Sequence, residues 1–269
     1  LLHLPRRRAV ELARMKNVII SGASSGIGRA TALRLARRGY RLALLARREA
    51  ELTEVATEVA KAGGTAIVRV VDVNDKKAIE EAVAAILDEW GHIDIAIANA
   101  GVRPEVRLDE ASVEVLRSTM ETNFFGAAAL AYAVLPSMKE RRGGHLIFMN
   151  TLDGRWANRL EGPYVATKHA LLGFAGVARK EFGDHGIDVT SILPGRVDTP
   201  MIDHLKVPSI QPKMSPEVVA KAVVKAINKR PAEIVLPPLR GRMLIALGVL
   251  FPRFADRFAD LLGLEGLPE

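Results

Sequence analysis

The chain has 269 residues, 49% of them hydrophobic, which suits one large α/β domain with a sizeable buried core and argues against disorder. It has no cysteine, so disulfides, zinc-finger ligation and thiolate catalysis are excluded, and we expect no metal site. The formal net charge of +7 is compatible with nucleic acid, a membrane surface or a phosphorylated ligand, but no basic stripe is interleaved with aromatic residues, so we expect no nucleic-acid partner.

Residues 1–14 are basic and lack the apolar core of a signal peptide, and Met15 stands directly before the first expected strand. We therefore treat residues 1–15 as an N-terminal extension. The longest apolar run, residues 243–251, is too short to span a bilayer, so we expect a cytoplasmic protein. The remaining chain divides into a main domain, residues 16–238, and an apolar, basic helical tail, residues 239–269.

Short apolar runs alternate with helical patterns along the main domain. The expected strands cover residues 16–21, 41–46, 65–71, 93–98, 144–150, 188–193 and 233–236. The expected helices cover residues 28–38, 49–62, 76–90, 112–124, 126–139, 164–182 and 216–228. This alternation predicts a single-domain α/β fold with a Rossmann-like, doubly wound parallel sheet covered on both faces. Such sheets bind ligands beyond the carboxyl ends of their strands.

The loop between the first strand and the first helix is rich in glycine and serine. Its candidate cofactor-binding residues are Gly22, Ser24, Ser25, Gly26, Ile27 and Gly28. Glycine here allows a tight turn, close approach to a phosphate and close packing of helix on strand. The helix that follows directs its N-terminal NH groups at the anion. Because the loop joins the first strand to the first helix, it predicts a dinucleotide site more strongly than a structural turn.

The second expected strand is followed by Arg47 and Arg48, where enzymes that prefer NAD usually carry an acid for the ribose 2′-hydroxyl. Two arginines favour NADP(H) over NAD(H), because they could clamp a 2′-phosphate. The alternative is that they are solvated charges at a helix start. Asp72 and Val73 follow the third strand, where the carboxylate could accept from the adenine amine; a simple helix N-cap is the equal alternative for Asp72.

Four further motifs follow in chain order. They are Asn99-Ala100-Gly101 after the fourth strand, Asn123 in a helix, Tyr164 and Lys168 in Tyr-x-x-x-Lys, and a segment after the sixth strand that contains Pro194, Gly195, Val197 and Thr199. With the glycine loop, their order and spacing resemble the short-chain dehydrogenase/reductase family over residues 16–236. The resemblance implies that these residues bind a nicotinamide cofactor or catalyse. It also implies a homodimer or homotetramer formed through two long helices.

Tyr164 and Lys168 are four residues apart, so on a helix they share one face about one turn apart. A tyrosine hydroxyl with a pKa of about 10 is a poor base at neutral pH, and a nearby ammonium lowers that pKa. Tyr164 can then protonate a carbonyl oxygen as hydride arrives, or accept the proton in reverse. Lys168 could also bind the hydroxyls of the nicotinamide ribose.

Thr151 stands thirteen residues before Tyr164, where the resembled family normally has serine. The hydroxyl that would hold the substrate oxygen is retained, while the extra methyl group stiffens the side chain and crowds the pocket. A strand-end cap is the alternative for Thr151. The resemblance gives Asn123 a role in holding a relay water near Lys168, and a bond to backbone is its alternative.

The expected substrate-lining residues are Asp153, Arg155, Trp156 and Leu205. Leu205 belongs to the expected loop at residues 201–214, in which Val207 and Ile210 could complete an apolar lid. This favours a hydrophobic ketone, aldehyde or secondary alcohol. Solvated loop charges are the alternative for Asp153 and Arg155.

Residues 240–264 carry apolar side chains at helical spacing, with Arg242, Arg253 and Arg257 among them. We favour packing of this tail on its own domain or on a neighbouring subunit. Peripheral contact with a membrane surface is the less favoured alternative.

The sequence therefore predicts an NADP(H)-dependent oxidoreductase that acts on a small carbonyl or alcohol substrate, with Tyr164 as general acid and base. Two alternatives remain open. One is an NADP(H)-binding sensor with weak or no turnover, which is suggested by Thr151 standing where the resembled family normally has serine. The other is a membrane-associated reductase of lipid substrates.

Overall fold

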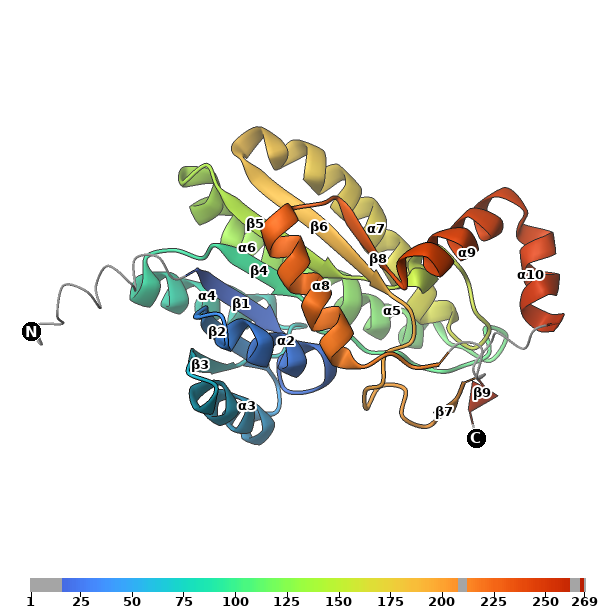
Figure 1. Ribbon diagram of the computed structural model, residues 1–269, viewed down its shortest axis with the longest axis horizontal. Coiled ribbons are helices and arrows are strands. Elements are labelled where there is room, and N and C mark those ends of the chain that lie inside the picture. The colour runs from blue at the N-terminus through green and yellow to red at the C-terminus, as the bar shows by residue number, and fades with distance from the viewer. Residues whose placement is uncertain (1–15, 208–211, 262–266, 269) are drawn as a thin grey trace, which may run out of the picture.

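The computed structural model describes residues 16–207, 212–261 and 267–268. Its centre is a seven-stranded parallel sheet in the order β3-β2-β1-β4-β5-β6-β8 (Figure 1). The strands are β1 (Asn17–Ser21), β2 (Arg41–Ala46), β3 (Thr65–Val70), β4 (Ile95–Ala98), β5 (Gly144–Met149), β6 (Ile187–Pro194) and β8 (Glu233–Leu236). The predicted doubly wound α/β fold is confirmed, while the expected extension at residues 1–15 lies outside the described residues.

The order of the strands reverses between β1 and β4. The chain runs from β1 outward to β2 and β3, then returns to place β4 against the other side of β1. Ile20 pairs with Leu44 of β2 on one side and with Ile97 of β4 on the other. Loops that leave such a pair of strands diverge to opposite faces of the sheet and leave a crevice between them.

Helices cover both faces of the sheet (Figure 1). The helices α2 (Gly26–Ala36), α3 (Glu49–Lys61) and α8 (Pro216–Lys229) pack on one face, and α4 (Lys76–Trp90), α6 (Gly126–Glu140) and α7 (Gly162–Glu181) on the other. Successive strand residues point to opposite faces, so Val18 and Ile20 join the first core while Ile19 joins the second. Both faces being buried explains why the strands read as continuous apolar runs.

The two helices expected at residues 112–124 and 126–139 are continuous in the structure. α5 (Val113–Met120) passes through a π-helical turn, η1 (Glu121–Phe125), directly into α6. The periodicity of the sequence does not distinguish a π turn from a break, because one extra residue per turn shifts the apolar positions in the same way. π turns of this kind are frequent at functional sites.

Several expected boundaries were wrong by one or two residues. α2 begins at Gly26 and α7 at Gly162, each two residues earlier than expected, because glycine and a first-turn proline are tolerated at a helix start. β3 ends at Val70, and β4 begins at Ile95. The expected loop at residues 201–214 contains a short strand, β7 (Leu205–Lys206), which pairs antiparallel with β9 (Leu267–Pro268), a long-range partner that local sequence cannot reveal.

The tail forms two helices, α9 (Pro238–Leu250) and α10 (Pro252–Leu261). Phe251 between them has φ −138° and ψ 62°, because the residue before a proline is driven out of the helical region. Among the described helices, none has both the length and the apolar content to cross a bilayer.

We expect Ile20→Ala to lower the free energy of unfolding by about 2–5 kcal/mol, because Ile20 is fully buried at the centre of the sheet and truncation leaves a cavity. Urea unfolding followed by circular dichroism measures the loss. Val70→Ala, at a 51% exposed side chain of the edge strand β3, is the control and should cost far less. Equal effects at the two positions would contradict this description of the core.

Candidate active site

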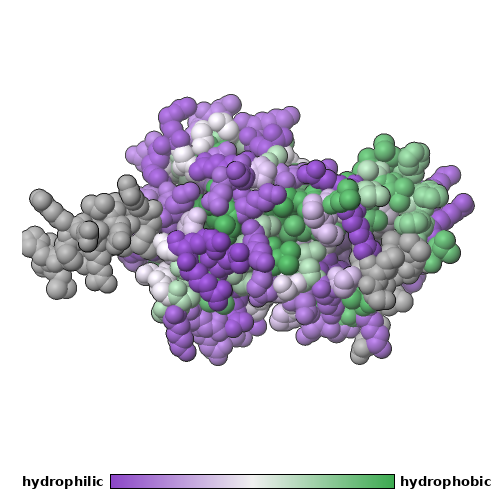
Figure 2. All heavy atoms as spheres, viewed as in Figure 1, coloured by the Kyte–Doolittle hydropathy of each residue, from purple (hydrophilic) through white to green (hydrophobic). Residues whose placement is uncertain are grey.

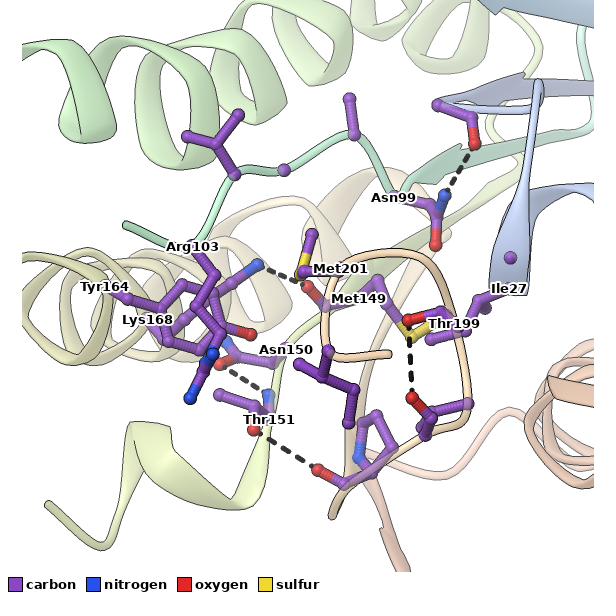
Figure 3. A pocket seen from close by; sticks show the side chains of 18 of the residues that line it. Ile27, Asn99, Arg103, Met149, Asn150, Thr151, Tyr164, Lys168, Thr199 and Met201 are labelled. Carbon is purple, nitrogen blue, oxygen red and sulfur yellow. Dashed lines mark hydrogen bonds between the residues drawn. The ribbon is translucent and has the colours of Figure 1, made fainter. Parts of the chain in front are cut away.

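A cavity of about 370 Å³ lies at the carboxyl ends of β1, β4, β5 and β6, within the range typical of ligand sites. It runs from Arg47 and Arg48, past the glycine loop, to Tyr164 and Lys168. Figure 3 shows Tyr164, Lys168 and Thr151 on one side of this space and Ile27 and Asn99 on the other. Of the residues expected to bind cofactor, the cavity is lined by Gly22, Ser24, Ser25, Gly26, Ile27, Arg47, Arg48, Asp72, Val73, Asn99, Ala100, Gly101, Tyr164, Lys168, Pro194, Gly195, Val197 and Thr199.

The glycine loop needs glycine at two kinds of position. Gly22 has φ +65°, and a Cβ there would lie 2.8 Å from the Cα of Ala100. Gly28 does not line the cavity; a Cβ on it would lie 2.1 Å from the carbonyl oxygen of Gly22, so it lets the loop close on itself. No side chain caps the start of α2, since Ser25 makes no capping bond. The NH groups at this helix start are thus directed at the cavity, as an anion requires.

Asn99 ties the loop to the end of β4. Its side-chain amide donates to the carbonyl oxygens of Ser21 and Gly22, each at 3.1 Å. The Ser21 hydroxyl oxygen in turn accepts from the backbone NH groups of Asn99 at 3.0 Å and Ala100 at 3.2 Å. Figure 3 shows Asn99 directed at the loop. The Asn-Ala-Gly motif therefore braces the cofactor loop as well as lining the cavity.

The arginine pair closes the far end of the cavity. Arg48 donates from one nitrogen to the hydroxyls of Ser24 and Ser25, both at 2.9 Å, and lies 3.2 Å from a Glu51 carboxylate oxygen. Arg47 is more exposed and lies 3.7 Å from an Asp72 carboxylate oxygen. Arg48 thus stands beside the glycine loop with its guanidinium fixed by the two loop serines, a position from which it could bind a phosphate next to the loop.

Asp72 does not cap a helix. Its carboxylate accepts from the backbone NH of Asn74 at 3.0 Å, whereas Asp75 caps α4 by accepting from Ala78. The N-cap interpretation of Asp72 was therefore wrong by three residues. Asp72 still lines the cavity beside Val73.

Tyr164 and Lys168 lie on α7, both buried and facing the cavity. The Lys168 ammonium donates to the carbonyl oxygen of Met149 at 2.9 Å and lies 5.6 Å from the centre of the Tyr164 ring. Burial lowers the pKa of Lys168 to about 8. Burial also raises the pKa of Tyr164, and the negative charges of Asp153 and Glu161 add to this. The lysine therefore does not set a low tyrosine pKa by itself, and Tyr164 carries its proton at neutral pH.

Thr151 combines the two roles considered for it. Its hydroxyl oxygen accepts from the NH of Asp153 at 3.3 Å and so caps the short helix η2 (Leu152–Gly154). The same hydroxyl faces the cavity and donates to the Asp153 carboxylate at 2.8 Å, with the Pro194 carbonyl oxygen at 3.3 Å. A hydroxyl has one hydrogen to donate, so Asp153 competes with any substrate oxygen for it.

Asp153 is accessible to the cavity and enclosed by protein on its other sides. Its second carboxylate oxygen accepts from the Asn158 amide at 2.7 Å. Burial raises the pKa of Asp153 to about 7; the charge of Glu161 adds to this, and the Thr151 hydroxyl and the charge of Arg103 oppose it. Asp153 is thus a substrate-side carboxyl poised to change charge near neutral pH.

Asn123 does not line the cavity. It is fully buried in η1, where its amide nitrogen donates to the Val102 carbonyl oxygen at 2.9 Å and to the Thr167 hydroxyl at 3.0 Å. Its amide oxygen accepts from the Val102 NH at 2.8 Å. The side chain therefore fixes the segment after β4, as its structural interpretation required.

A buried ion cluster beside Tyr164 was missed in the sequence. Arg103, only 6% exposed, pairs with Glu105 and, at 2.6 Å, with Glu161. Arg103 and Glu161 are 58 residues apart, so no local pattern signals their contact. The adjacency of Glu161 to the Tyr-x-x-x-Lys helix is the one hint that the sequence carries.

Arg155 was wrongly expected to line the substrate pocket. Its guanidinium pairs with Glu233 of β8, 78 residues away, and the residue lies outside the cavity. Asp153, Trp156 and Leu205 do line it. Val207 lies outside it, and Ile210 lies outside the described residues. The tail contributes a part of the cavity wall that the sequence did not predict, because Gly241, Leu244 and Ile245 of α9 line the cavity.

The family model for short chain dehydrogenases matches residues 16–207. The chain belongs to the short-chain dehydrogenase/reductase family. It is 37% identical over 222 residues to a fatty acyl-CoA reductase from Acinetobacter baylyi, covering 81% of this chain and 75% of that protein. It is 31% identical over 271 residues to Dehydrogenase/reductase SDR family member 7B from Rattus norvegicus, covering 94% of this chain and 83% of that protein.

Among solved structures, this dehydrogenase/reductase fold is similar to an alcohol dehydrogenase from Thermococcus sibiricus complexed with 5-hydroxy-NADP. The TM-score is 0.76 and the identity 30%, with 82% of this chain and 96% of that chain covered. A short-chain type dehydrogenase/reductase from Mycobacterium marinum gives the same TM-score at 26% identity, covering 82% of this chain and 93% of that chain. The family and its oxidoreductase character are thus supported by sequence and by fold.

We expect Asp153→Asn to stabilise this short-chain dehydrogenase/reductase increasingly as the pH rises. The folded pKa of about 7 exceeds the unfolded value of about 3.9, so the wild-type contribution is fully present below about pH 4 and is lost as the pH rises through 7. The variant has no such titration and keeps an amide beside Thr151. Thermal melts from pH 4 to pH 8 measure the difference, which should grow up to about pH 7 and then level off.

Asp109→Asn is the control for this titration, since Asp109 is an exposed carboxylate whose pKa is lowered by Arg107. Its melting difference should not favour the variant as the pH rises. A pH-independent difference for Asp153→Asn would show that the Asp153 carboxyl does not titrate near neutrality.

Proposed function

We propose that this protein is an NADP(H)-dependent oxidoreductase that transfers a hydride between the nicotinamide and the carbonyl or alcohol carbon of a hydrophobic substrate. The observation that carries the proposal is that one continuous cavity contacts both groups of residues. It is lined by the arginine-flanked glycine loop and by the buried Tyr164, Lys168 and Thr151. A bound nicotinamide supplies the hydride. All other groups that the reaction needs come from the chain itself.

The cofactor would be held by residues whose arrangement fits it. Gly22 and Gly26, with φ +65° and +52°, keep the loop low enough for a pyrophosphate to reach the start of α2. Arg48, bonded to both loop serines, and the exposed Arg47 would bind a 2′-phosphate. The Asp72 carboxylate would accept a hydrogen bond from the adenine amine, and the Lys168 ammonium would bind the hydroxyls of the nicotinamide ribose.

In the proposed reduction, Tyr164 donates its proton to the substrate oxygen as the carbon accepts hydride. Its raised pKa suits this direction, because the phenol is protonated at neutral pH. Thr151 holds the same oxygen when its hydroxyl is released from Asp153. After transfer, the charge left on Tyr164 is stabilised by the neighbouring Lys168 ammonium, which is fixed by the Met149 carbonyl.

An apolar substrate is supported by the apolar side chains that line the cavity together with the catalytic groups. They are Leu152, Trp156, Leu205, Leu244 and Ile245. The relative named as a fatty acyl-CoA reductase supports an apolar substrate, whereas the neighbour complexed with 5-hydroxy-NADP supports the cofactor. We therefore include a long-chain acyl or similar apolar carbonyl compound among the substrates to test first.

The proposal includes a homodimer or homotetramer. The two long helices expected to form it correspond to the continuous helix α5-η1-α6 and to α7. Both carry exposed apolar side chains, namely Phe125 at 50% and Tyr132 at 55% on the first and Val177 at 54% on the second. Such exposure on neighbouring helices is typical of an association surface.

We expect Arg48→Leu to weaken NADPH binding roughly 10–100-fold while leaving NADH binding nearly unchanged, because about 1.5–3 kcal/mol comes from a charge-assisted bond to the 2′-phosphate. Titration followed by nicotinamide fluorescence measures both affinities. Arg38→Leu, at an exposed arginine in the turn after α2, is the matched control and should bind as the wild type does. Parallel losses for NADPH and NADH would contradict a role in phosphate recognition.

We expect Tyr164→Phe to lower the turnover of NADPH with apolar ketones and aldehydes by about 10²–10⁴-fold, because the proton donor is lost. Cofactor affinity should be retained. Absorbance of NADPH measures the rate, and Tyr132→Phe, at an exposed position on α6, is the control. Firm NADPH binding without turnover by the wild type over a broad panel would instead favour the sensor, and Thr151→Ser would then be the next variant.

A further inference from the structure

α9 is apolar on two opposite faces. Its inner face carries Leu244 and Ile245, which line the cavity, and Gly248, which lies against Trp156. Its outer face carries Leu239 at 75% exposure and Met243 at 64%. Apolar side chains that gather at an exposed helix face are typical of a surface that a partner or a membrane covers. With 13 residues α9 is too short to cross a bilayer, so whatever covers it must lie along it.

α10 continues the exposed apolar surface. Ala255 and Ala259 are buried, whereas Phe254 is 60% exposed and Leu261 82%. Phe254, Phe258 and Leu261 are spaced at i, i+4 and i+7, so they form one row along the helix, and the two rings stack at 6.1 Å. Figure 2 shows hydrophobic side chains gathered over α9 and α10, in contrast to the hydrophilic surface over most of the molecule.

Exposed arginines border this surface. Arg242 lies on the outer side of α9, and Arg253 and Arg257 each precede a phenylalanine of the α10 row by one residue. An arginine at the edge of an apolar surface can lay its aliphatic stem on that surface while its guanidinium reaches outward. The exposed Asp256 lies on the side of α10 away from the phenylalanines. The pattern of an apolar face with a basic border complements an anionic lipid surface.

We propose that α9 and α10 form a docking surface for an anionic lipid bilayer, with the exposed apolar side chains Leu239, Met243, Leu250, Phe251, Phe254 and Leu261 entering the interface. The arginine border favours an anionic bilayer over the same surface of a second copy, since a symmetric pairing would bring the border arginines of the two copies together. Because the opposite face of α9 is a wall of the cavity, docking brings the cavity within about one helix diameter, roughly 10 Å, of the membrane.

Flotation of the full chain with lipid vesicles tests this proposal. We expect binding to vesicles that contain phosphatidylglycerol, weaker binding to pure phosphatidylcholine, and loss of binding at high salt. Phe254→Asp and the double variant Arg253→Glu, Arg257→Glu should each reduce binding at least tenfold. Val218→Asp, in the first turn of α8 at a 39% exposed apolar residue, is the matched control and should bind as the wild type does.

A conservative variant guards against loss of folding. Phe254→Trp should keep vesicle binding, and brominated acyl chains should quench its fluorescence. Absence of vesicle binding, equal binding to neutral and anionic vesicles, or an unquenched Trp would overturn the proposal. Dissociation of an oligomer by Phe254→Asp without any effect on vesicles would assign the surface to a second copy instead. None of these measurements requires cofactor or turnover, so they stand apart from the proposed oxidoreductase activity.

Discussion

The bond network between the ends of β1 and β4 is the constraint on which the site depends. Two neighbouring parallel strands leave the sheet in opposite directions here, and their loops would otherwise separate. Asn99 joins them by donating to the carbonyl oxygens of Ser21 and Gly22, while Ser21 accepts from the backbone beyond β4. The glycine loop thereby has one shape before any ligand arrives. Preorganisation of this kind lowers the ordering cost of binding a flexible dinucleotide.

The catalytic end of the cavity is governed by buried charge. Arg103 neutralises Glu105 and Glu161 only in part, since two carboxylates face one guanidinium, and Asp153 stands within range of the remaining negative field. Burial first, and this negative field second, raise the pKa of Asp153 and of Tyr164 and so favour their protonated forms. A site that must deliver a proton to a substrate oxygen benefits from such an environment, although the buried like charges cost stability.

The sequence predicted the parts of this architecture that are locally encoded. Apolar runs identified all seven strands of the sheet, and the glycine loop and the Tyr164–Lys168 pair were correctly placed at its carboxyl edge. Contacts between distant segments could not be predicted. Arg155 was expected in the pocket because its ion-pair partner, Glu233, lies 78 positions away in the sequence. Arg103 was overlooked for the same reason, since its partner Glu161 lies 58 positions away. The inner face of α9 was missed because apolar side chains on two opposite faces of a helix do not show which face lines the cavity.

The antiparallel pairing of β7 with β9 ties the chain beyond α10 back to the segment that follows β6. The stretch that contains α8, β8, α9 and α10 is therefore a closed loop rather than a free arm. Leu205 of β7 lines the cavity, so the ladder links that wall mechanically to the tail helices. A load that lifts the tail from the body would therefore act on the cavity through two elements at once, Leu205 of β7 and the inner face of α9.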